Sequence, residues 1–173
     1  MNQACVYSLN TESPEEVTAI VDQFDDLLSS FERIRDDRTV LIKRFHRKSP
    51  RALEKLADDL GRRLAYWAPI QARIEGFDVF VDPPAGRGPV VYLTVRSPGL
   101  IELHRELADA YGTVIDSIEG EHYVPHITLA RGGERTDIRP LTKASVEPVD
   151  WSIDELTLWD GRYSQPVRRY ELS

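Results

Sequence analysis

Residues 123–131 read YVPHITLAR, and the interpretation of the whole chain begins from this stretch. Two polar side chains, His126 and Thr128, interrupt an otherwise apolar run. Successive side chains of a β-strand point to opposite faces, so residues two apart share a face. The stretch therefore predicts a strand that presents His126 and Thr128 on one face and Ile127 and Leu129 on the other.

The polar groups of this stretch suit the chemistry of a phosphodiester. The imidazole of His126 can give or take a proton near neutral pH, and the Thr128 hydroxyl can donate a hydrogen bond to an anionic oxygen. Arg131 has the opposite parity in an ideal strand, and a bend at Gly132-Gly133 would turn its guanidinium toward a phosphate. The alternative is structural, because a histidine on a strand is usually a hydrogen-bonded structural residue and an isolated H-x-T is a weak signal.

The composition predicts a soluble globular protein. The chain has 173 residues, 41% of them hydrophobic and 29% charged. Its single cysteine, Cys5, excludes an internal disulfide framework and a multi-cysteine zinc site. No apolar run approaches the about 20 residues of a membrane helix, and the N-terminus lacks a signal-peptide pattern, so a cytoplasmic protein is expected. The net charge of -7 argues against broad, nonspecific nucleic-acid binding but permits a small basic groove.

The order of the predicted elements is that of an α+β protein. Helices are expected at 14–31, 49–64 and 97–112, because each begins with Ser-Pro and shows apolar residues at helical spacing. Gly76 is expected to form a bulge or bend. The order of these helices and of the strands along the chain predicts a mostly antiparallel sheet. Strands are expected at 3–10, 39–45, 70–82, 89–95, 126–131, 152–159 and 165–172.

The chain resembles the 2H phosphoesterase superfamily, which includes 2'-5' RNA ligases and RNA 2',3'-cyclic phosphodiesterases. The strongest point of resemblance is PHITLAR at 125–131, which is similar to that family's second H-x-T motif. The strand VVYLTV with the helix after it, and the closing SIDELTLWDGRYSQPVRRYEL, are also similar, so the resemblance covers nearly the whole chain. It implies one bilobal domain over 1–173, with two lobes of mostly antiparallel sheets around a central groove and helices on the outside. Two H-x-T motifs would face each other there, one histidine acting as general base and the other as general acid, without a metal or cofactor.

The first of these motifs is degenerate in this chain. It should lie on the strand before the second helix, where residues 38–45 read RTVLIKRF without a histidine. The spacing to the helix places Thr39 and Leu41 nearest the His and Thr positions. A register shifted by one would place Arg38 and Val40 there instead.

Several residues are candidates for the missing role. Lys43 shares the face of Thr39 in an ideal strand, where it would neutralise a phosphate or, if desolvated, serve as an acid. His46 follows the strand by one residue and would have to turn toward the groove. Arg38 or Arg44, on the other face of the strand, would bind phosphate under the shifted register. Tyr163, in the loop before the last strand, is a candidate for stacking on a base.

The resemblance implies a metal-independent phosphodiesterase or RNA ligase-like protein that acts on RNA ends with a 2',3'-cyclic phosphate or a 2',5' linkage. His126 would be the acid or base, Thr128 an oxyanion donor and Arg131 a phosphate clamp. The expected partner is an RNA end or small phosphorylated nucleotide, with no membrane partner and a monomeric protein. The alternative is a noncatalytic module that holds such a ligand on the same fold, and a third reading is a structural protein that binds no nucleotide. His104 is expected to be a surface or boundary residue of its helix, and Trp159 is expected in the core or between the lobes.

Overall fold

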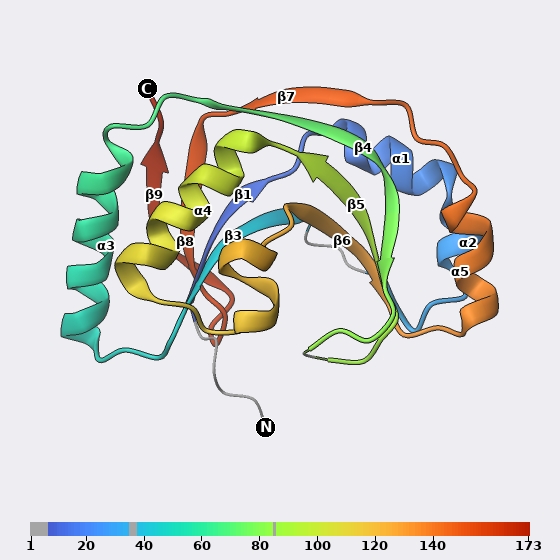
Figure 1. Ribbon diagram of the computed structural model, residues 1–173, viewed down its shortest axis with the longest axis horizontal. Coiled ribbons are helices and arrows are strands. Elements are labelled where there is room, and N and C mark those ends of the chain that lie inside the picture. The colour runs from blue at the N-terminus through green and yellow to red at the C-terminus, as the bar shows by residue number, and fades with distance from the viewer. Residues whose placement is uncertain (1–6, 35–37, 85) are drawn as a thin grey trace.

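The computed structural model in Figure 1 describes residues 7–34, 38–84 and 86–173, so the predicted strand at 3–10 begins outside the described residues. The strands are β1 (Tyr7–Glu12), β2 (Arg33–Ile34), β3 (Thr39–Phe45), β4 (Ile70–Phe80), β5 (Val90–Arg96), β6 (His126–Arg131), β7 (Val149–Ile153), β8 (Glu155–Asp160) and β9 (Gln165–Glu171). The helices are α1 (Glu16–Gln23), α2 (Asp25–Leu28), α3 (Pro50–Leu64), α4 (Pro98–Tyr111) and α5 (Arg135–Thr142), with short 3-10 turns at Asp116–Ile118 and Gly120–His122.

The strands form one curled, antiparallel half-barrel sheet (Figure 1). In the described part of the chain the strand order is β7-β4-β5-β6-β3-β1-β8-β9, and β2 pairs with β6. The two halves of this continuous sheet meet where β3 lies beside β6 through the pair Val40–Ile127. The α+β class and the antiparallel pairing are therefore confirmed, with a continuous sheet across the seam between β3 and β6.

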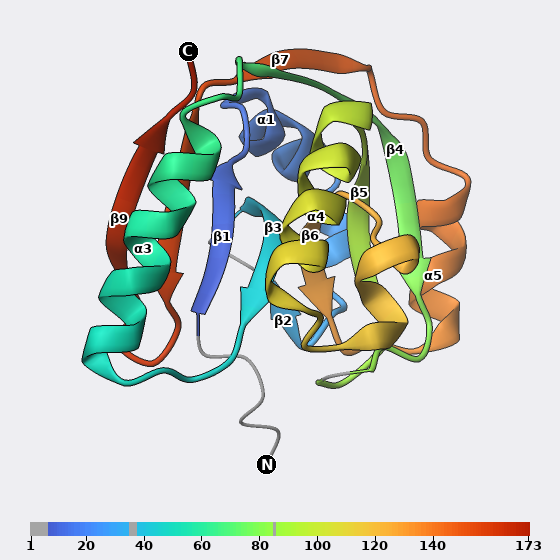
Figure 2. The ribbon, with the colours of Figure 1, turned by 60° about the vertical axis from the view of Figure 1, so that its left-hand side comes forward.

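One face of the sheet carries the hydrophobic core and the helices. Leu9, Val40 and Ile127 on the central strands are fully buried on this face, and Leu60 of α3 and Leu103 of α4 pack into the same core. Figure 2 shows α3 beside β9 and α4 lying over β3, and Figure 1 shows α1, α2 and α5 together at the other end of the sheet. The expectation of helices on the outside is thus confirmed.

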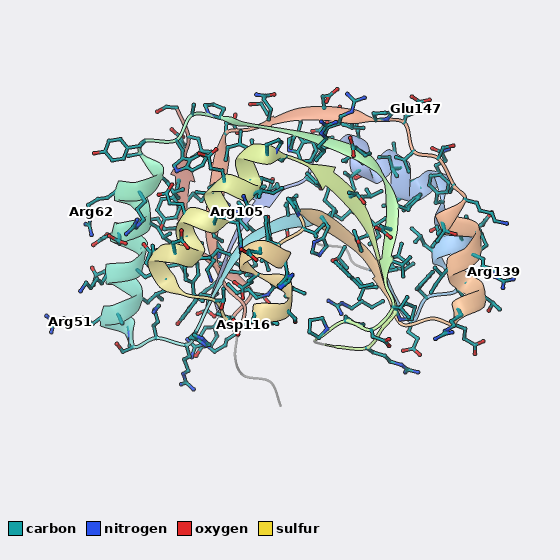
Figure 3. The ribbon with its side chains drawn as sticks, in the orientation of Figure 1. Arg51, Arg62, Arg105, Asp116, Arg139 and Glu147 are labelled. Carbon is teal, nitrogen blue, oxygen red and sulfur yellow. The ribbon has the colours of Figure 1, made fainter. Side chains whose placement is uncertain are left out.

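The outer surfaces of the helices are strongly charged. Figure 3 shows the labelled Arg51 and Arg62 pointing outward from α3, and Arg139 pointing outward from α5, away from the sheet. Among the described residues, every helix is too short or too polar to cross a membrane.

Three features of the elements differ from the sequence-based expectation. The helix expected at 14–31 is divided at Phe24, whose φ of -109° and ψ of 18° leave the helical region while its ring packs against Phe77 at 4.8 Å. The segment 152–159 is divided at Asp154, because β7 lies beside β4 and β8 lies beside β1 in the other half of the sheet. The polar segment after β6 contains α5, which begins with a capping box. The bulge expected at Gly76 is confirmed by a register shift in β4.

Contacts outside the strand ladder reinforce the seam between β3 and β6, and one of them is directly testable. The Tyr123 hydroxyl, which is buried, donates to the Leu41 carbonyl at 2.9 Å. Tyr123→Phe should lower the free energy of unfolding by about 1 kcal/mol, because it removes one buried hydrogen bond and leaves the carbonyl without this donor. Urea unfolding measures the change. Tyr66→Phe, at a side chain that is 92% exposed, is the control and should leave stability unchanged. Equal effects of the two substitutions would contradict a role for Tyr123 at the seam.

Candidate functional site

A cavity of about 310 Å³ opens on the face of the sheet opposite the hydrophobic core. Its lining comes from β1, β3, β6, β8 and β9, so it crosses the seam between the two halves. His126 and Thr128 line it, while Ile127 and Leu129 are fully buried. The predicted strand at 126–131 and its division into a polar and an apolar face are therefore confirmed.

Thr39 and Leu41 stand where the first motif would lie. Because Val40 pairs with Ile127 in an antiparallel ladder, the continued register sets Leu41 opposite His126 and Thr39 opposite Thr128. All four of these side chains line the cavity. Val40 is fully buried in the core, so the structure has the register with Thr39 and Leu41 in the groove and not the shifted one.

The His126 ring has a defined tautomer and a packed environment. Its Nδ1 lies 2.7 Å from the carbonyl of Val124, and since a carbonyl only accepts, Nδ1 carries the proton. In the neutral ring Nε2 is therefore the basic nitrogen. The ring packs edge-on against Phe80 at 5.4 Å and Tyr92 at 5.0 Å. Burial, together with the nearby Asp78 carboxylate, raises the pKa of Tyr92 to about 12, so its hydroxyl stays protonated beside His126 at neutral pH.

Arg131 reaches the cavity through a β-bulge. On β5, Tyr92 pairs with Thr128 and Val91 with Ala130, so Leu129 is an extra residue in β6. The extra residue reverses the alternation, and Arg131 lines the cavity despite its parity in an ideal strand. This bulge, rather than the expected bend at Gly132-Gly133, turns Arg131 to that face.

The loop between β4 and β5 passes close to the Arg131 guanidinium. A Cβ atom at Gly86 would lie 2.9 Å from Nη1 of Arg131, and Gly86 has a φ of +77°. The positive φ favours glycine, because another residue would be strained there, and an added side chain would also shift the Arg131 guanidinium.

An equivalent bulge in β3 corrects the expectation for Lys43. Leu9 pairs with Lys43 and Asn10 with Leu41, so Ile42 is the extra residue. Lys43 consequently lies on the core face, 1% exposed, and the prediction that it shares the face of Thr39 was wrong because ideal alternation takes no account of a bulge. Arg44 lines the cavity in its place.

Strands β3 and β6 share a bulge and an arginine at equivalent positions. Residues 39–44 read TVLIKR and 126–131 read HITLAR. Each has its bulge at the fourth residue and its cavity-lining arginine at the sixth. The sequence analysis compared only the H-x-T positions, and an alignment of these two hexapeptides would have placed Arg44 in the groove under the Thr39 register.

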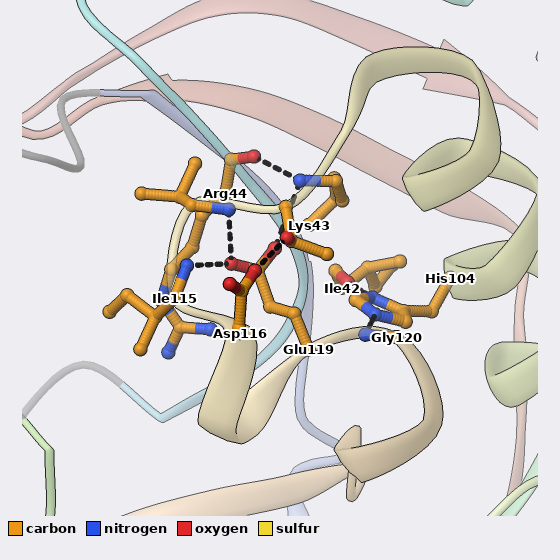
Figure 4. A network of polar contacts seen from close by, with 10 residues as sticks. Ile42, Lys43, Arg44, His104, Ile115, Asp116, Glu119 and Gly120 are labelled. Carbon is orange, nitrogen blue, oxygen red and sulfur yellow. Dashed lines mark hydrogen bonds and ion pairs between the residues drawn. The ribbon is translucent and has the colours of Figure 1, made fainter.

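Lys43 takes part in a buried ion pair on the core face (Figure 4). Its Nζ donates to Glu119 Oε1 at 2.9 Å, and Glu119 Oε2 accepts from the backbone N–H groups of Val114 and Ile115 at 2.8 and 2.6 Å. Burial alone would raise the pKa of Glu119, but the Ile115 N–H and the Lys43 ammonium hold the pKa below its ordinary value. Lys43 is therefore committed to the fold and does not line the cavity.

His104 is fully buried, whereas a surface or boundary position on α4 was expected. Its Nδ1 donates to the carbonyl of the bulged Ile42 at 2.6 Å, and its Nε2 accepts from the Gly120 N–H at 2.7 Å. The ring stacks on Tyr123 at 4.0 Å. Burial, with smaller effects from the charges of Lys43 and Arg44, lowers the pKa of His104, so the neutral ring that these two hydrogen bonds require is favoured.

The remaining candidates lie elsewhere. His46 is exposed one residue beyond β3, and Tyr163 is 68% exposed in the turn between β8 and β9, where the Arg162 guanidinium lies 5.2 Å from its ring. Neither is among the described residues that line the cavity. Trp159 and Arg169 do line it, and the sequence analysis had placed Trp159 in the core or between the lobes. Among the described residues, no three His, Cys, Asp or Glu side chains are grouped closely enough to hold a metal ion.

Comparison with solved structures shows the same fold throughout the chain. The structure of Escherichia coli LigT complexed with 3'-AMP is 18% identical, with a TM-score of 0.69 and 98% of each chain covered. TT0787 of Thermus thermophilus is 19% identical, with a TM-score of 0.65, 96% of this chain and 97% of that chain covered. A structure described as a phosphoesterase is 17% identical, with a TM-score of 0.61, 98% of this chain and 99% of that chain covered. No curated protein matches the chain.

The antiparallel half-barrel sheet with its helices places the chain in the class of LigT-like folds. The model of the 2'-5' RNA ligase superfamily matches residues 38–163, and this chain belongs to that superfamily.

The buried ion pair yields a stability prediction. Lys43→Met should lower the free energy of unfolding by about 3–5 kcal/mol, because it leaves the Glu119 carboxylate buried without its partner cation. Arg73→Met removes the exposed ion pair with Asp150 and should cost less than about 1 kcal/mol. Chemical unfolding at neutral pH compares them. A loss for Lys43→Met no larger than that for Arg73→Met would show that Glu119 does not depend on Lys43.

Proposed function

We propose that this chain is a metal-independent phosphodiesterase or RNA ligase-like protein that acts on RNA ends or small nucleotides with a 2',3'-cyclic phosphate or a 2',5' linkage. The observation that carries the proposal is the meeting of His126, Thr128 and Arg131 in one cavity. The LigT structures complexed with 3'-AMP and with NADP+ support a nucleotide as the occupant.

Each of the three residues has a distinct role in this proposal. The Thr128 hydroxyl and the Arg131 guanidinium bind oxygens of the phosphate, the hydroxyl as a single donor and the guanidinium as a charged fork. In hydrolysis of a cyclic phosphate, water attacks phosphorus, its proton passes to Nε2 of His126, and one ribose P–O bond breaks. The leaving ribose oxygen must then gain a proton, either from His126 or from solvent.

The composition of the cavity predicts slow turnover. Leu41 cannot transfer a proton, the Thr39 hydroxyl does so poorly at neutral pH, and His126 is the only histidine among the described lining residues. Loss of one of two acid-base groups lowers a rate on the order of 10²–10⁴-fold. The same observation favours a second candidate, a module that binds an RNA end without turnover.

Substitution of His126 tests the catalytic proposal. His126→Ala should abolish hydrolysis of adenosine 2',3'-cyclic phosphate in the absence of added metal, a loss of about 10² or more, because the basic nitrogen is removed. Its melting temperature should stay within about a degree or two of the wild type, since the ring is only half-buried. His122→Ala, at an exposed residue outside the cavity, is the control and should keep full activity.

The outcomes separate the two candidates. Equal turnover in His126→Ala and the wild type would refute the catalytic role. Absence of turnover in a wild type that binds 3'-AMP would establish the binding module in its place.

Restoration of the first motif tests the register. A histidine at position 39 would lie diagonally across the seam from His126, with Cβ atoms about 7–8 Å apart, close enough for both rings to reach one phosphate. Thr39→His combined with Leu41→Thr should therefore raise turnover about 10²-fold. The matched control, Arg38→His with Val40→Thr, places the same residues in the shifted register and should give no gain, since Val40 is in the core. No gain from the first pair, in a folded protein that binds 3'-AMP, would count against the placement of the motif.

A further inference from the structure

The cavity extends well beyond the two motif strands. Pairing across β1, β8 and β9 continues one row of lining residues from Leu41 through Asn10 and Thr157 to Arg169. At about 4.8 Å per strand, Arg169 lies roughly 14 Å from Leu41 across the sheet. A single phosphate beside His126 would therefore leave this part of the cavity empty.

A second row lies next to the first. Ser8 pairs with Arg44 on one side and with Trp159 on the other, and all three line the cavity. Arg44 lies about 10 Å along β3 from the Val40–Ile127 pair at the seam, allowing for the bulge. It is thus displaced from the His126 and Thr128 positions by more than the width of one phosphate group.

This end of the cavity is cationic. Arg44 and Arg169 contribute two guanidinium groups, and no ion pair joins either of them to a carboxylate of the described residues. With Arg131, the described lining has three arginines against one carboxylate, Glu12, in a chain whose net charge is -7. A cluster of arginines on an acidic protein is a recognition feature for phosphate rather than a property of the whole surface.

Ser8 and Trp159, on the strands between these two arginines, suit the binding of a nucleotide. The Ser8 hydroxyl accepts a hydrogen bond from Asn10 Nδ2 at 2.8 Å and keeps its own proton to donate to a phosphate oxygen. The half-buried Trp159 indole lies beside it and offers an aromatic surface on which a base can stack. Phosphate donors and a stacking surface therefore occur together, one nucleotide away from His126.

We propose that Arg44, Arg169, Ser8 and Trp159 form a second nucleotide subsite, so that the occupant of the cavity is a single-stranded oligonucleotide of at least two nucleotides. This inference rests on the proposed function, because it places the reacting phosphate at His126. Arg44 and Arg169 bind the neighbouring phosphate, and Trp159 stacks on its base.

Calorimetric binding of two probes tests the subsite without requiring turnover. The probes are 3'-AMP and the dinucleotide ApAp, which carries one additional internucleotide phosphate and one additional base. The wild type should bind ApAp about tenfold or more tightly than 3'-AMP, since one charge-assisted hydrogen bond alone supplies about that factor. In Arg44→Gln and in Arg169→Gln this ratio of affinities should fall about fivefold or more.

Arg168→Gln is the matched control. Arg168 neighbours Arg169 on β9 but pairs with Asp58 of α3 on the opposite face, so this variant should keep the wild-type ratio. Thermal unfolding establishes that each variant is folded. For the wild type, the dependence of log affinity on log salt should be steeper for ApAp than for 3'-AMP by about 0.7 per additional phosphate.

The alternative outcomes are distinct. Equal affinity of the wild type for ApAp and 3'-AMP would overturn the subsite while the proposed function stands. An ApAp preference that survives both arginine substitutions would also overturn it. A wild type that binds neither probe would refute the proposed function together with the subsite.

Discussion

The extra residue at Ile42 is the constraint on which much of the molecule depends. By reversing the alternation of β3, it turns Arg44 to the cavity and Lys43 into the core. A lysine buried in that way needs an anion, and Glu119 supplies it. The Ile42 carbonyl also needs a donor, which His104 supplies. Because Glu119 and Gly120 belong to the segment that leads into β6, the groups that satisfy the bulge also set the position of the strand that carries His126.

The contacts of Glu119 and His104 therefore couple the packing of β3 to the position of β6. The ladder between β3 and β6 is short, with Val40 paired to Ile127, and this alone would fix the separation of the two motif positions weakly. Hydrogen bonds from His104 and Tyr123 to the carbonyls of Ile42 and Leu41 add directional links across the same seam. If the cavity holds a phosphate between the two strands as proposed, it benefits from such links, because a binding group displaced by an ångström loses much of its effect.

The match between TVLIKR and HITLAR indicates what this chain has kept and what it lacks at its first motif. The bulge and the arginine are present in both strands, whereas the histidine and threonine of H-x-T are present only in β6, because β3 has Thr39 and Leu41 at those positions. An arginine can bind an anion and the bulge orients that arginine, whereas a histidine can transfer a proton. The first strand has therefore kept the means of holding an anion without the means of reacting with it. A ligand held at several points but served by one proton-transfer group is the physical consequence.

Part of the site could be predicted from the sequence. The rest could not, because it depends on pairing between residues that are distant in the chain. The polar face of His126 and Thr128 and the placement of Thr39 and Leu41 follow from local alternation and spacing. A bulge arises from the match between two strands, so the positions of Arg44, Lys43 and Arg131 could not be derived from either strand alone. His104 lies 62 residues from the carbonyl that it binds, and Trp159 faces the cavity because β8 joins β1 across the fold.

If the cavity binds nucleic acid as proposed, the distribution of charge decides which nucleic acids it accepts. The helices present an outer surface that is highly charged, and the chain as a whole repels polyanions through its net charge of -7. The arginines of the cavity lie on the other face of the sheet from the helices. A long double helix would meet the repulsion of the whole surface but could not place its phosphates against Arg44 and Arg169 together with a base on Trp159. Under the proposed function, a short single-stranded end would carry few charges, bend into the cavity and expose its bases for stacking, so this arrangement would favour RNA ends over duplexes.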